Sequence, residues 1–132
     1  NQYVFDVGHQ CYTHKLYTGR RDRFDTLRKK DGLSGFPSPN ESIHDAFVSG
    51  HGSTSISVAI GLATAKKLKG EPGKVIAMIG DGAFTGGMAY EGMNNIDKKL
   101  DNLIVILNDN EMSIDEPAGA LDRYLVRIST SR

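Results

Sequence analysis

The decapeptide VIAMIGDGAF at residues 75–84 joins five consecutive apolar residues to an aspartate flanked by glycines. A short apolar run that ends in a glycine-rich turn is typical of a buried strand in a parallel sheet. The run LIVIL at residues 103–107 has the same character. Between them, the segment from Gly86 to about Asp97 has the length and apolar spacing of a helix. This part of the sequence therefore predicts a strand, a helix and a second, parallel strand.

The segment from Ser53 to Gly70 predicts another helix. Ser53 has a side chain typical of an N-cap, and glycine is common where a helix ends. The apolar residues between Ser53 and Gly70 recur every three or four positions and share one helical face: Ile56, Ala59, Ile60 and Ala63.

In the other predicted helix, which follows Gly86, we expect Met88 and Met93 to lie in the core.

Shorter elements complete a predicted α/β fold, in which helices cover both faces of a parallel sheet. Strands are expected at residues 4–7 and 46–48, amphipathic helices at 22–30 and 121–128, and a loop at 32–40. Ligands of such sheets bind beyond the carboxyl ends of the strands. We therefore expect the polar turns that follow the strands to form one ligand-binding edge.

Composition excludes several classes of function. Sixteen basic residues balance sixteen acidic ones among 132 residues, and no basic stripe indicates a nucleic-acid partner. The longest apolar runs are far shorter than the roughly 20 residues of a membrane span, so no membrane partner is expected.

Cys11 is the single cysteine, and we interpret it as a small buried residue, not a nucleophile. The missing initial Met and the uncapped end after Ser129 favour a piece of a longer polypeptide.

Asp81 is a candidate ligand for a hard cation, because it follows a strand between two flexible glycines. Magnesium prefers oxygen ligands and often shares them with phosphates. Asn110, which follows the next strand, would supply a second oxygen. A magnesium-diphosphate site is therefore one hypothesis for this edge of the sheet. The alternative is that both residues belong to ordinary turns.

Two histidines stand beside glycines at predicted strand or helix ends. His9 and His51 could contact a phosphate or transfer a proton near neutral pH, although a backbone carbonyl could equally satisfy each ring. We interpret His14 and His44 as surface or structural residues. The basic residues at positions 20–23 are interpreted as a solvated helix start and not as a phosphate contact.

Five motifs, taken in order, resemble the 1-deoxy-D-xylulose-5-phosphate synthase family of transketolase-like enzymes. They are DVGHQ at 6–10, TGR at 18–20, GHGSTS at 50–55, IGDGA at 79–83 and ILNDNEMSI at 106–114. The resemblance implies condensation of pyruvate with D-glyceraldehyde 3-phosphate, dependent on thiamine diphosphate and Mg²⁺, with release of CO₂. The product, 1-deoxy-D-xylulose 5-phosphate, would feed isoprenoid, thiamine and pyridoxal synthesis.

The same resemblance assigns roles to individual residues. Asp81 and Asn110 would bind Mg²⁺ through their side chains, with Asn110 also at the cofactor, and Met112 would bind the metal through its backbone carbonyl. Gly82 and Ala83 would offer their backbone to the diphosphate.

The histidines also match the family. His9 and His51 would act at the reacting part of the cofactor, with Gly50 and Gly52 forming the wall beside them. Gly52 replaces a serine that many family members carry, and Ser53 could compensate for the lost hydroxyl.

Enzymes of this family are homodimers several times longer than 132 residues. The resemblance therefore implies that residues 1–132 are the diphosphate-binding domain, without the pyrimidine-binding and C-terminal domains, and that this segment alone is inactive. The expected location is the cytoplasm of a bacterium or the plastid stroma of a plant or alga. Two alternatives stay open, another transketolase-like thiamine enzyme and a non-catalytic flavodoxin-like binding domain.

Overall fold

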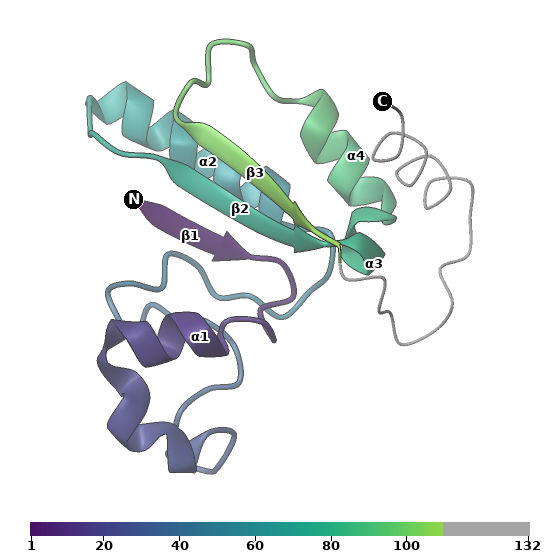
Figure 1. The fold of residues 1–132 in the computed structure, drawn as a ribbon. Helices are drawn as coiled ribbons and strands as arrows, with labels where there is room; N and C mark the ends of the chain where they lie inside the picture. Colours follow the sequence, from purple (N-terminus) through teal and green to yellow (C-terminus); the bar gives the residue numbers. More distant parts are fainter. Residues whose placement is uncertain (110–132) are drawn as a thin grey trace.

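Three parallel strands form one sheet, in the order β1-β2-β3, in a computed structural model that describes residues 1–109 (Figure 1). They are β1 (Gln2–Phe5), β2 (Val75–Gly80) and β3 (Leu103–Asn108). In the register of β2 and β3, Val75 lies beside Leu103 and Gly80 beside Asn108. The two strands predicted from their apolar runs are confirmed, and each extends one residue further than expected.

The helices α2 (Ser55–Lys69) and α4 (Gly87–Asn94) are both confirmed. As expected, α2 ends at Gly70, which adopts the left-handed conformation. A separate helical turn, α3 (Asp81–Phe84), precedes α4 at the carboxyl ends of β2 and β3 (Figure 1). None of the helices within residues 1–109 is both long and apolar enough to cross a membrane.

Helices lie on both faces of the sheet at β1. Val4 packs with α2 in the core, whereas its neighbour Phe5 lies 5.2 Å from the ring of His14, centroid to centroid. Successive side chains of a strand point to opposite faces, and His14 belongs to α1 (Tyr12–Lys15). The expected placement of helices is therefore confirmed at this strand.

The core contains two clusters of buried side chains, which the sheet forms with α2 and, in the second cluster, also with α4. The first is Val4, Ala59, Ala63, Val75 and Ala77, and the second is Ile56, Ile79 and Ala89. The prediction that Met88 and Met93 lie in the core is wrong, because they are 51% and 40% exposed. Helix α4 packs instead through Ala89 and Gly92, and a Cβ on Gly92 would lie 3.1 Å from the side chain of Ile56. Small residues bring the two helices close and leave the methionines outside.

The helix predicted at residues 22–30 is wrong. The chain forms a π-helical turn η1 (Leu16–Arg20) and a 3₁₀ helix η2 (Arg21–Thr26). Arg28 then adopts a positive φ of 60°, and its backbone N–H donates to the carbonyl of Leu33 at 2.7 Å. The helical conformation ends just before this turn, because Leu27 is already extended, with a ψ of 128°.

Two predicted strands also differ from the structure. Residues 46–48 join no strand, and Phe47 and Val48 are 42% and 58% exposed. The strand expected at 4–7 ends at Phe5, because Val7 has a φ of 55°. The helix expected at 121–128 lies outside the described residues.

A buried group of charged side chains joins η1 to the loop that precedes α2. Arg20 donates to both carboxylate oxygens of Asp45, at 2.6 and 2.9 Å, and to Glu41 at 2.9 Å. Lys15 pairs with Glu41, and His14 lies 3.0 Å from Asp45. His14 is thus structural as expected, but the interpretation of Arg20 as solvated is wrong, because it is only 5% exposed. These distant carboxylates could not be recognised as its partners from the sequence.

Candidate active site

The carboxyl ends of the three strands lie at one edge of the sheet (Figure 1), where Gly80, the last residue of β2, lies between the turn after β1 and the end of β3. A Cβ at this position would lie 3.2 Å from Nε2 of Gln10, in the turn after β1, and 3.9 Å from the carbonyl oxygen of Asn108. A larger residue would require only the end of the exposed Gln10 side chain to move. The turns after β1 and β2 therefore lie together, beside the end of β3, at the edge where the sequence predicts ligand binding.

The loop before α2 also reaches this edge, although no strand precedes it. Asp6, which follows β1, is 1% exposed. Its Oδ1 accepts a hydrogen bond from the backbone N–H of Ser53 at 2.7 Å, and its Oδ2 accepts one from Ser55 at 2.9 Å. The prediction of Ser53 as the N-cap is wrong, because the N-cap position is Thr54, without a side-chain cap bond. The carboxylate of Asp6, in the turn after β1, instead accepts hydrogen bonds from backbone N–H groups at the start of the helix.

Ser53 instead connects this loop to the turn after β2. Its φ of 65° lies in the left-handed region, and its hydroxyl donates to the carbonyl of Ala83 at 2.7 Å. Gly86 permits the contact, because a Cβ there would overlap Ser53 Oγ and lie 2.9 Å from Ser53 Cβ. Ser53 is thus brought next to Ala83, one of the residues expected to face a diphosphate.

Asp81 begins α3 directly after β2 and is partly exposed. Within residues 1–109, its carboxylate forms no ion pair with a basic side chain. The first turn of α3, with Gly82 and Ala83, has no side-chain cap. In this part of the chain no cluster of three or more His, Cys, Asp or Glu side chains could hold a metal. Asn110 and Met112, the other expected metal ligands, lie outside the described residues.

His9 and His51 are both exposed, on the turn after β1 and on the loop before α2. A contact between these two segments is visible at Gly8, whose φ of 95° favours glycine. A Cβ on Gly8 would lie 3.0 Å from that of Ser49. The structure thus packs the segment that leads to His51 against the residue next to His9.

The two glycines beside His51 differ in their surroundings. A Cβ on Gly50 would meet nothing within 4 Å, and one on Gly52 would lie 3.6 Å from the side chain of Val7, an ordinary contact. A serine at position 52 would therefore fit without a shift of the backbone. The packing therefore allows either glycine or serine at this position.

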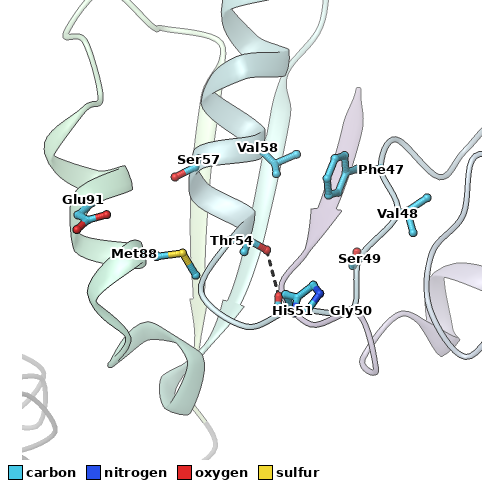
Figure 2. Close-up of a pocket in the computed structure, with 10 residues that line it drawn as sticks. All are labelled: Phe47, Val48, Ser49, Gly50, His51, Thr54, Ser57, Val58, Met88 and Glu91. Carbon is cyan, nitrogen blue, oxygen red and sulfur yellow. Dashed lines mark hydrogen bonds between the residues drawn. The ribbon is translucent and has the colours of Figure 1, made fainter.

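A pocket of about 410 Å³ lies beside this loop, between α2 and α4 (Figure 2). His51 lines it, and the hydroxyl of Thr54 donates to the His51 carbonyl at 3.1 Å. Asp81 is not among its lining residues, so the pocket adjoins the expected diphosphate site and is not identical with it. The other residues around it are Phe47, Val48, Ser49, Gly50, Ser57, Val58, Met88 and Glu91. The sequence prediction missed this pocket because it assigned Phe47, Val48 and Met88 to strand or core.

Cys11 is fully buried, as expected, and burial raises the pKa of its thiol. A thiol with a raised pKa is a poor nucleophile at neutral pH.

Asp6 belongs to the motif at residues 6–10, but the sequence does not indicate its contacts. Its hydrogen-bond partners, Ser53 and Ser55, are 47 and 49 residues away in the chain.

Comparison with known proteins places the whole chain in one family. A family model described as 1-deoxy-D-xylulose-5-phosphate synthase matches residues 1–132. The synthase of Caldanaerobacter subterraneus subsp. tengcongensis is 61% identical over 96% of this chain, and synthase 1 of Geobacter metallireducens is 61% identical over 97%. The chain spans about a fifth of the length of these relatives, 20% in each case.

The fold has a counterpart among solved structures. Transketolase from Leishmania mexicana superposes with a TM-score of 0.78 at 21% identity, over 97% of this chain and 22% of that protein. At this identity the similarity shows the fold alone, which is that of the transketolase-like enzymes. Together with the sequence matches over the full chain, it leads to one conclusion: the chain belongs to the 1-deoxy-D-xylulose-5-phosphate synthase family.

Proposed function

We propose that residues 1–132 are the diphosphate-binding domain of a thiamine diphosphate- and Mg²⁺-dependent enzyme. The whole enzyme would condense pyruvate with D-glyceraldehyde 3-phosphate to give 1-deoxy-D-xylulose 5-phosphate and CO₂. The observation that carries the proposal is the meeting of three family motifs at one sheet edge. Asp6, Ser53 and Ala83, one from each motif, are joined there by hydrogen bonds.

The chemistry of the donor groups fits a magnesium diphosphate. Asp81 offers a carboxylate that no described cation neutralises, and Mg²⁺ prefers such oxygen ligands together with phosphate oxygens. The backbone at Gly82 and Ala83 follows immediately and would face the diphosphate. Asn110 and the carbonyl of Met112 would complete the metal ligands. When bound, thiamine diphosphate supplies the carbanion chemistry, and the protein supplies binding and orientation.

His9 and His51 are proposed to hydrogen-bond the cofactor and to hold or transfer a proton there. Both are exposed, His9 in the turn after β1 and His51 in the loop before α2, and an imidazole can donate or accept a proton. Gly50 and Gly52 would form the wall beside His51. Pyruvate and D-glyceraldehyde 3-phosphate are the proposed substrates, and a homodimer in the bacterial cytoplasm or plastid stroma is the proposed state.

A ligand-dependent thermal shift tests the diphosphate site. The full-length protein that carries residues 1–132 is melted with Mg²⁺ plus thiamine diphosphate, with Mg²⁺ plus pyrophosphate, and with each ligand plus a chelator. A ligand at 100 times its Kd stabilises a folded protein by about 2.7 kcal/mol, so a clear rise in Tm is expected only with metal. Asp81→Ala should abolish the shift, whereas Asp25→Ala, at an exposed carboxylate on η2, should keep it. Cooperative melting without any metal-dependent shift would contradict the proposal.

A further inference from the structure

We infer that Asp6 is a positioning residue, which holds the loop that carries His51 against the turn that carries the proposed diphosphate ligands. The inference rests on the proposed function and adds to it a residue that would not touch the cofactor. Asp6 would act through Ser53, whose backbone it binds and whose hydroxyl reaches Ala83.

The position of Asp6 is itself well determined. Its backbone N–H donates to the carbonyl of Met78 at 2.8 Å and so continues the pairing of β1 with β2. Its carboxylate is buried, and each oxygen accepts one backbone N–H, from Ser53 and from Ser55. Burial of a carboxylate is costly unless its oxygens are satisfied by hydrogen bonds or charges. The Asp6 carboxylate accepts hydrogen bonds from these two backbone amides. Within residues 1–109 it forms no ion pair with a basic side chain.

Two hydrogen bonds, one to Asp6 and one to Ala83, set the conformation of Ser53. A serine with a φ of 65° is in a region that residues other than glycine rarely adopt. The bond from its N–H to Asp6 and the bond from its hydroxyl to Ala83 hold it there from both sides. The three turns are thereby linked in the order Asp6, Ser53, Ala83.

The loop is also anchored at its other end. Asp45 is bound by Arg20 through two hydrogen bonds and accepts a third from the backbone N–H of Ser38 at 2.9 Å. The residues between these anchors, 46–52, include His51 and much of the pocket wall (Figure 2). Two buried carboxylates thus restrain the ends of the segment, and Asp6 restrains the end next to His51.

The test compares Asp6→Asn with wild type in the full-length protein. An asparagine keeps the size of the side chain, but it turns one acceptor into a donor that faces a backbone N–H. The readouts are the Kd of Mg²⁺ plus thiamine diphosphate, measured by calorimetry well below the Tm of each variant, and the Tm without ligand. Asp25→Asn, an exposed change of the same charge, is the matched control. We expect Asp6→Asn to raise the cofactor Kd at least tenfold and the control to leave it unchanged.

A merely structural role for Asp6 gives a different result. The Tm of Asp6→Asn would then fall while the Kd of the folded protein stayed within twofold of wild type, and this result would overturn the inference. If Asp6→Asn does not fold, Gly86→Ala decides, because its Cβ would push Ser53 away from Ala83 while both residues stay unchanged. A Kd raised severalfold supports the inference, and an unchanged Kd overturns it.

The same experiment separates this inference from the proposed function. If wild type binds the cofactor and Asp81→Ala does not, the diphosphate site stands whatever Asp6→Asn shows. If wild type itself fails to bind Mg²⁺ plus thiamine diphosphate, both the proposed function and the inference are wrong.

Discussion

Replacement of Gly86 by alanine probes the contact between the loop before α2 and the turn after β2. The new Cβ would overlap Ser53 Oγ, lie 2.9 Å from Ser53 Cβ and lie 3.4 Å from the carbonyl oxygen of Ala83. Overpacking of this kind costs about 1–3 kcal/mol, and alanine at the N-cap of α4 costs about 1 kcal/mol more. We expect the free energy of unfolding of this region to fall by about 2–4 kcal/mol.

The neighbouring glycine provides a matched control. A Cβ on Gly87 would meet nothing within 4 Å, and Gly87 is the first residue of α4. Gly87→Ala should therefore be neutral or stabilising by up to about 1 kcal/mol, because alanine is the better helix former. The assay is native-state hydrogen exchange of peptides from α2 and β2 across a urea series, which reports local stability within a longer protein.

A double variant tests the steric reasoning directly. Ser53→Gly removes both atoms of Ser53 that the new Cβ approaches, so Gly86→Ala combined with Ser53→Gly should recover at least about 1 kcal/mol relative to the sum of the single effects. Additivity within about 0.5 kcal/mol would refute the reasoning, as would a loss in Gly87→Ala equal to that in Gly86→Ala.

Three further predictions concern buried ionisable groups. Asp45→Ala leaves Arg20 buried without its bidentate partner, so the free energy of unfolding, measured by urea denaturation, should fall by about 3–5 kcal/mol. The control Asp101→Ala, in an exposed pair with Lys67, should leave this free energy unchanged. Although burial opposes ionisation, hydrogen bonds from basic side chains lower the pKa of Glu41 and of Asp45 below their ordinary values of 4.5 and 3.8. The unfolded chain then binds more protons below about pH 4.5, so Tm should fall as pH decreases through this range, and less steeply in Asp45→Asn. Because burial raises the pKa of the Cys11 thiol, labelling by iodoacetamide at pH 7 should need unfolding; rapid labelling of the native protein would contradict this.

Local patterns were sufficient for the central elements. The strands at 75–79 and 103–107 and the helix that ends at Gly70 were predicted correctly, because an apolar run or a periodic face has few stable alternatives in a parallel sheet. Residues 46–48 have a similar apolar character but line a pocket. A run of three residues does not distinguish a strand from an exposed apolar wall.

Asp81 and the loop around His51 could be proposed as a site from motif and order alone, because the carboxyl ends of parallel strands meet at one edge. What holds these parts together depends on contacts between residues far apart in the chain. Asp6 and Ser53 are 47 residues apart, and Arg20 and Asp45 are 25 apart. A hydrogen bond between such residues leaves no periodic signal in the sequence, since its partners are chosen by the path of the folded backbone. The sequence by itself therefore determined the family, the two central strands and the candidate ligands, whereas only the tertiary structure decided which distant residues hold the turns beside them in place.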